Sequence, residues 1–128
     1  EWAALHTAYG LSFRTEQQFQ STFMYRALVD GDVDVISAFS SDGRVVSNDL
    51  VVLEDPLEAI PPYDALILLA PSRARDASLH EALRPFVGAI SVDAMRQANE
   101  MVDRDRDKST TREAAQWLRS TIAESSVP

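Results

Sequence analysis

The sequence predicts an α/β fold that ends in a run of helices. Apolar and polar residues alternate at 33–39, and the apolar runs at 49–56 and 61–71 have the length and composition of strands. From Ser72 onward the apolar residues recur at helical spacing instead. With 128 residues, of which 45% are hydrophobic and 25% charged, the chain is long enough and apolar enough to form one globular domain with its own core.

The first part of the chain predicts a helix, a short strand and a second helix. Residues 1–8 are typical of the end of a helix, which Gly10 closes, because glycine readily adopts the left-handed conformation found after a helix. The alternation at 11–19 favours a strand. The next segment, 21–30, is typical of a helix that Ser21 or Thr22 caps at its start and that Gly31 ends.

Three strands are expected next. The segment 33–39 ("VDVISAF") is typical of a half-buried strand, and Pro56 stops the strand predicted over 49–56. In the third strand, over 61–71, the residues from Ala65 to Ala70 are nearly all apolar. Such a run predicts a strand inside a sheet that is covered on both faces.

The C-terminal part predicts three helices from their capping residues. Ser78–Glu81 and Thr110–Glu113 have the spacing of capping boxes, Gly88 is expected to end the first helix, and Ser91 to cap the second. The residues expected on the buried faces are Met95, Ala98, Met101 and Val102 in the second helix and Ala114, Trp117, Leu118 and Ile122 in the third.

Composition excludes several classes of function. The net charge of -8 argues against nucleic acid and anionic membrane surfaces as partners, because both select for clustered Lys and Arg. The chain has no cysteine, which excludes a disulfide framework, a thiolate metal site and a cysteine nucleophile. No apolar run approaches the ~20 residues that a membrane span needs.

Residues for catalysis or metal binding are scarce. His6 and His80 are the only histidines, and each is interpreted as a solvated helix residue, since neither starts a metal-ligand or triad spacing. The acidic residues at 30–34 resemble the start of a calcium loop, which requires glycine at its sixth position and glutamate at its twelfth. Counted from Asp30, these positions hold Val35 and Ser41, so the pattern does not fit. We therefore expect no catalytic residue, no metal and no cofactor.

Two aromatic residues stand at the ends of predicted strands. Phe39 ends one strand, just before the turn-forming residues Ser40, Ser41, Asp42 and Gly43. Tyr63 starts another, directly after two prolines that fix the backbone. Aromatic rings at strand ends in an α/β protein point to the crevice where ligands bind. The alternative is that both rings belong to the ordinary core, which patterning alone favours.

Three motifs carry a resemblance to a known family. "MYRALVDGDVDVISAFSSDGRV", "DLVVLEDP" and "PPYDA", with the closing "LRPFVGAISVDAMRQANEMVD" and "EAAQWL", are similar to the substrate-binding proteins of ABC importers for glycine betaine, choline and carnitine. The resemblance runs from about Tyr9 to Leu118 with the motifs in order.

The resemblance implies a two-lobed periplasmic-binding-protein fold (type II, Venus-flytrap) of α/β lobes that close on a ligand. Residues 1–48 then form the C-terminal part of the second lobe, 49–62 the crossover or hinge, and 63–128 the C-terminal part of the first lobe. Members of this family are longer, so the chain is expected to be the C-terminal half of such a protein. Half of that fold would leave the apolar run at 66–70 uncovered, which predicts self-association.

The resemblance also implies a ligand site. A trimethylammonium group carries charge without hydrogen-bond donors, and aromatic faces bind it through cation–π attraction of ~0.5–2 kcal/mol per ring. The family's "AYSTDGR" has a cage tyrosine at the position of Phe39, and its "PPYDA" has another at Tyr63. With the adjoining Ser40 and Asp42, these are the expected ligand-binding residues. The Phe at position 39 departs from the family's Tyr and removes a hydroxyl.

The implied function is that of the solute-binding component of an ABC importer for glycine betaine, choline or a related quaternary ammonium osmolyte. Such a protein works outside the cytoplasm, in the periplasm or at the membrane, with a membrane permease as its partner and without catalysis. A second hypothesis is a ligand-sensing or regulatory module of the same fold with a changed ligand. A small enzyme is disfavoured because no nucleophile–base pair can be assembled, and a soluble α/β domain of another role remains the fourth possibility.

Overall fold

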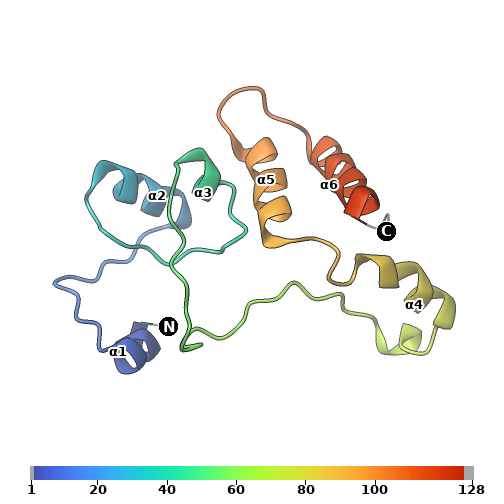
Figure 1. Ribbon diagram of the computed structural model, residues 1–128, viewed down its shortest axis with the longest axis horizontal. Helices are drawn as coiled ribbons and strands as arrows, with labels where there is room; N and C mark the ends of the chain where they lie inside the picture. The colour runs from blue at the N-terminus through green and yellow to red at the C-terminus, as the bar shows by residue number, and fades with distance from the viewer. Residues whose placement is uncertain (1, 126–128) are drawn as a thin grey trace.

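The computed structural model describes the backbone of residues 2–125 and the side chains of residues 2–122, and every regular element in that part is helical. Figure 1 shows these helices joined by long extended segments, with α4 at one end of the molecule, away from α2 and α3. The elements are α1 (Trp2–Tyr9), α2 (Ser21–Asp30), α3 (Arg44–Ser47), the 3₁₀ turn η1 (Pro71–Arg73), α4 (Ala77–Leu83), the 3₁₀ turn η2 (Arg84–Phe86), α5 (Val92–Asp103) and α6 (Thr111–Ser125).

The predicted α/β fold, and with it the two-lobed sheet architecture, is wrong for this chain, because residues 2–125 contain no strand. A strand exists through a ladder of hydrogen bonds to a neighbouring strand. Apolar alternation indicates which surface an extended segment presents, but not whether a partner strand lies beside it. Within the described part, the segments that were expected to be strands form no such ladder; they are 11–19, 33–39, 49–56 and 61–71.

The buried apolar residues are distributed over α2, α3, α5 and α6. α3 lies beside α5, and α5 beside α6 (Figure 1). The buried apolar residues of the described part are Tyr25 and Ala27 in α2, Val45 in α3, Ala98 in α5 and Ala114 in α6. The helical periodicity predicted Ala98 and Ala114 on buried faces, and this is confirmed. Small side chains at these two positions let the helices pack closely.

Most of the predicted helix ends are confirmed. Ser91 caps α5, where its Oγ accepts a hydrogen bond of 3.1 Å from the N–H of Ala94. The capping box before α6 is reciprocal, since the N–H of Glu113 donates to Thr110 Oγ1 at 3.2 Å and the N–H of Thr110 donates to Glu113 Oε2 at 2.7 Å. Gly31 ends α2 in the left-handed conformation, with φ of 79°. The predicted cap at the start of α2 is wrong, because Gln20 holds that position without a side-chain hydrogen bond.

The predicted start of α4 is wrong. Ser78 does not cap this helix, because Asp76 precedes it and its carboxylate accepts a hydrogen bond of 3.0 Å from the N–H of Leu79. A carboxylate at this position also interacts favourably with the helix dipole, which favours the earlier start. The α-helix ends at Leu83 and continues as η2, which contains Pro85, a residue without an N–H to donate.

The apolar run at 65–70 is exposed instead of lying inside a sheet. The exposed fraction is 76% for Leu66 and 86% for Leu68. The division at 1–48, 49–62 and 63–128 stays a prediction, and residues 1 and 126–128 lie outside the described part. None of the helices within residues 2–125 combines the length and the apolar character that crossing a membrane requires.

Candidate functional site

The two aromatic residues singled out in the sequence lie next to each other. The ring centroids of Phe39 and Tyr63 are 6.0 Å apart, and the ring planes meet at 76°, which is an edge-to-face arrangement. Both rings are open to solvent, with exposed fractions of 64% for Phe39 and 65% for Tyr63. The alternative that both rings belong to the buried core is therefore wrong, and the pair forms an exposed aromatic corner.

A tight turn fixes the chain directly after Phe39. The carbonyl of Phe39 accepts a hydrogen bond of 3.0 Å from the N–H of Asp42, and the carbonyl of Asp42 accepts one of 3.2 Å from the N–H of Val45 at the start of α3. The chain thus passes from the extended segment before Phe39 into α3 within a few residues. The ring stands at the last extended position before this turn.

Ser40 and Asp42, the other two predicted ligand-binding residues, make contacts within the protein. The carbonyl of Ser40 accepts a hydrogen bond of 2.7 Å from Arg96 Nε in α5. The carboxylate of Asp42 accepts two hydrogen bonds from the Arg44 guanidinium, 3.0 Å from Nε to Oδ1 and 2.7 Å from Nη2 to Oδ2. Asp42 therefore anchors the turn through a two-point ion pair.

The Asp42–Arg44 pair also meets a buried tyrosine of α2. The Arg44 guanidinium carbon lies 4.1 Å from the centroid of the Tyr25 ring, and its Nη1 donates a hydrogen bond of 2.9 Å to the carbonyl of Ser21. Hydrogen bonds from Arg44 hold the pKa of the Asp42 carboxyl below its ordinary value, although desolvation acts against this. Burial, and then the nearby Asp42 carboxylate, raise the pKa of Tyr25 to about 12.

Tyr63 follows a second ordered turn. The carboxylate of Asp55 accepts hydrogen bonds from the N–H groups of Ala59 and Ile60, at 3.1 Å and 2.8 Å. The hydroxyl of Tyr9 in α1 donates to the same carboxylate and accepts a hydrogen bond of 2.9 Å from the N–H of Leu57. Two prolines precede Tyr63 and restrict the backbone there. The turn and the prolines together limit the positions that the Tyr63 ring can take.

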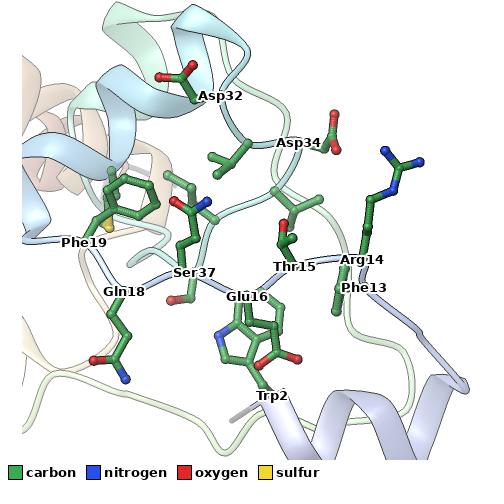
Figure 2. A pocket seen from close by; sticks show the side chains of 15 residues that line it. Trp2, Phe13, Arg14, Thr15, Glu16, Gln18, Phe19, Asp32, Asp34 and Ser37 are labelled. Carbon is green, nitrogen blue, oxygen red and sulfur yellow. The ribbon is translucent and has the colours of Figure 1, made fainter.

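A separate cavity of about 430 Å³ lies between α1 and the extended segments that follow α1 and α2 (Figure 2). Trp2 and Phe13 form one corner of its wall, with ring centroids 5.2 Å apart. Glu16, Asp32 and Asp34 belong to the same lining. The sequence reasoning missed this cavity. The available signal was Gly10, which follows α1 with φ of 64° and precedes Phe13, the residue that contacts Trp2.

The two histidines do not form a catalytic arrangement. His6 Nε2 lies 2.9 Å from Glu16 Oε1, and its ring packs edge-on against Phe13, so this side chain has partners and is not simply solvated. His80 Nε2 lies 2.9 Å from the carbonyl of Ala74. Within residues 2–125, no three or more His, Cys, Asp or Glu side chains are grouped so that they would hold a metal ion.

Comparison with known proteins identifies the family. Residues 1–120 match the family model described as the substrate binding domain of ABC-type glycine betaine transport systems. Two curated sequences named carnitine transport binding protein OpuCC, from Listeria monocytogenes and from its serotype 1/2a strain 10403S, are each 29% identical to the chain over 103 residues.

These matches cover most of this chain but a smaller part of each relative. They include 80% of this chain but 33% of each relative, so the chain spans about a third of the length of the curated relatives it matches. No solved structure matches the chain significantly. The family match extends over nearly the whole chain and includes both aromatic residues of the exposed corner. The chain therefore belongs to the family of substrate-binding domains of ABC-type glycine betaine transport systems, which are binding proteins and not enzymes.

Proposed function

We propose that this chain is a solute-binding component of an ABC importer and binds a quaternary ammonium osmolyte such as glycine betaine or choline. The observation that carries the proposal is the exposed pair of Phe39 and Tyr63, whose rings come from separate segments and meet at 6.0 Å and 76°. Two rings at this angle form two walls of an aromatic cage. The family match and the similarity to carnitine transport binding proteins support the same class of ligand.

The chemistry of the ligand explains why rings are needed. A trimethylammonium group spreads its positive charge over methyl groups and has no N–H to donate, so carbonyls and carboxylates alone bind it poorly. The face of an aromatic ring carries partial negative charge and attracts such a cation without a hydrogen bond. Phe39 and Tyr63 both retain that face, and with exposed fractions of 64% and 65% both are accessible to a ligand from solvent.

The polar neighbours have different parts in the proposal. Asp42 contributes indirectly, since its carboxylate is bound by Arg44 and fixes the turn after Phe39. Ser40 follows Phe39 directly in the sequence, and its hydroxyl is proposed as a polar contact for the rest of the ligand. We further propose that the domain works outside the cytoplasm and delivers its ligand to a membrane permease, as befits a substrate-binding domain of an ABC transporter.

The expected affinity follows from the exposure of the rings. Exposed cation–π contacts contribute about 0.5–1 kcal/mol per ring, so the two rings together correspond to a dissociation constant on the order of 0.1 M for this chain. The test is a titration by NMR, in which choline chloride is added to several times that concentration and the ring protons of Phe39 and Tyr63 are followed. Sodium chloride at equal ionic strength corrects for salt.

A neutral ligand of the same shape is the decisive control. In 3,3-dimethylbutanol, carbon replaces the nitrogen of choline, so the molecule keeps its size but loses its charge. Cation–π binding predicts saturable shifts with choline and much smaller shifts with the alcohol. Equal shifts with both would mean that the corner is a general apolar contact, and no shift with choline or glycine betaine would reject the proposed ligand class.

The departure at Phe39 favours one alternative, a sensing or regulatory module of the same family with a changed ligand. The missing hydroxyl at this position removes a polar contact but leaves the face of the ring. Phe39→Tyr separates the two possibilities, because a transport-type cage is expected to bind glycine betaine equally well or more tightly with tyrosine. A weaker response to glycine betaine in Phe39→Tyr would favour the changed ligand.

A further inference from the structure

We propose that helix α5 positions the Phe39 wall of the cage, and that Arg96 and Asn99 are the positioning residues. This inference rests on the proposed function for its ligand, but the contacts on which it depends lie within the protein itself. Arg96 Nε donates a hydrogen bond of 2.7 Å to the carbonyl of Ser40, and Asn99 Nδ2 donates one of 2.8 Å to the carbonyl of Ser41. The two donors stand three positions apart on α5 and therefore on one face of the helix.

Backbone contact brings α5 close enough for these bonds. A side chain at Gly43 would meet α5 directly, because a Cβ atom there would lie 2.3 Å from the backbone N of Glu100 and 2.6 Å from its Cα. The φ of Gly43 is -62°, an ordinary value for any residue, so glycine is required here by the close approach and not by its conformation. The turn therefore packs directly on the helix backbone, and α3 lies beside α5 in Figure 1.

The guanidinium of Arg96 suits this role. Its side chain is only 18% exposed, and its Nη1 reaches Asp93 Oδ1 at 3.1 Å on the same helix while Nε reaches the Ser40 carbonyl. The Asp93 side chain is 88% exposed, so a carboxylate that faces solvent pairs with the positive charge of Arg96. The planar guanidinium has several N–H donors and can bind both partners at once, which a lysine with a single ammonium group does less well.

The turn is thus held from two sides. Arg44 binds Asp42 and reaches the Ser21 carbonyl of α2, while Arg96 and Asn99 hold the adjoining carbonyls from α5. Phe39 projects into solvent directly beside this fixed turn. A ring whose backbone is already ordered loses less freedom when a ligand binds, and this preorganisation favours binding without any contact between α5 and the ligand.

The test measures the order of the turn first and ligand binding second. Backbone ¹⁵N relaxation of Phe39, Ser40 and Ser41 is compared in the native chain, Arg96→Ala and Asn99→Ala, before choline is added. We expect rigid order parameters of about 0.85 in the native chain and values below about 0.6 in both variants. The choline-induced shift of the Phe39 ring protons is expected to fall about twofold or more in the variants, because ordering of the turn then opposes binding.

Arg104→Ala is the matched control. Arg104 follows α5 directly and also donates to a backbone carbonyl, that of Asp107, but in the loop toward α6. This variant is expected to lose a comparable contact while the turn stays rigid. Arg96→Lys retains one donor and is expected to restore part of the order, and Asn99→Ala provides the same measurement if Arg96→Ala does not fold.

The outcomes distinguish this inference from the proposed function. If the turn keeps its rigid order parameters in Arg96→Ala and in Asn99→Ala, or loosens equally in Arg104→Ala, α5 does not position the ring and the inference is wrong. If the turn loosens only in the first two variants while the native chain shows no response to choline, α5 orders the Phe39 turn as inferred, and it is the proposed ligand that is wrong.

Discussion

Replacing Tyr63 by alanine is expected to weaken binding of a quaternary ammonium ligand and to cost little stability. The ring is 65% exposed, so about a third of its surface is removed from water. Full burial of a large apolar side chain contributes roughly 2–3 kcal/mol, so the burial lost here amounts to about 1 kcal/mol or less. The edge-to-face contact with Phe39 adds about 0.5–1.5 kcal/mol at most. One exposed cation–π wall is lost, which weakens binding about twofold to fivefold.

Tyr25 provides the contrast within the same chain. It is 3% exposed, so Tyr25→Ala leaves a cavity and is expected to cost roughly 3–5 kcal/mol of the free energy of unfolding. The assay pairs a urea unfolding curve with the NMR titration of Phe39 by choline, for both variants and for Tyr63→Phe, which keeps the ring face. Tyr63→Ala with a stability loss as large as that of Tyr25→Ala and an unchanged response to choline would refute the cage assignment.

Three further expectations follow from the turn and from the exposed apolar run. Hydrogen bonds from Arg44 lower the pKa of Asp42 in the folded state. The stability that the Asp42 carboxylate contributes is therefore present above its ordinary pKa of 3.8 and is lost as the pH falls through the pKa of the folded state. Asp42→Asn should flatten this loss of stability in acid, which urea midpoints measured from pH 6 to pH 2 will show. Gly43→Ala is expected to cost about 1–3 kcal/mol of stability by pushing α5 away, which thermal unfolding measures, and an unchanged Tm would contradict the backbone contact. Leu66 and Leu68 are exposed at 76% and 86%, so the native chain should self-associate in sedimentation experiments and the double replacement by lysine should abolish this; a native chain that is monomeric at high concentration would count against it.

The sequence predicted the helices better than the extended segments, and the reason is physical. A helix end is decided by residues close in the chain, so the reciprocal bonds of Thr110 and Glu113 and the cap at Ser91 were predictable from spacing alone. A strand is decided by a partner that is distant in the chain. The apolar run at 65–70 has the composition of a buried strand, but nothing in its own residues specifies a neighbour.

The candidate site was likewise predicted only in part. Phe39 and Tyr63 were singled out because each stands at the end of an apolar segment, beside turn residues or prolines, and the structure brings the two rings together. The residues that hold the turn were not predicted, since Arg96 and Asn99 lie in a helix whose polar face has no distinguishing pattern. Gly43 was identified only as a turn residue, and its contact with Glu100 depends on packing that no local pattern records.

The contact between Gly43 and Glu100 joins parts of the chain that are made at different times. A ribosome adds roughly 5–20 residues per second, so the turn after Phe39 is complete for some seconds before α5 exists to support it. During that interval the nascent chain contains Phe39, and Gly43, four residues further on, has no helix to pack against. The contact between the turn after Phe39 and α5 therefore depends on a helix that is made late, and a chain released before Arg96 would contain both rings but lack α5.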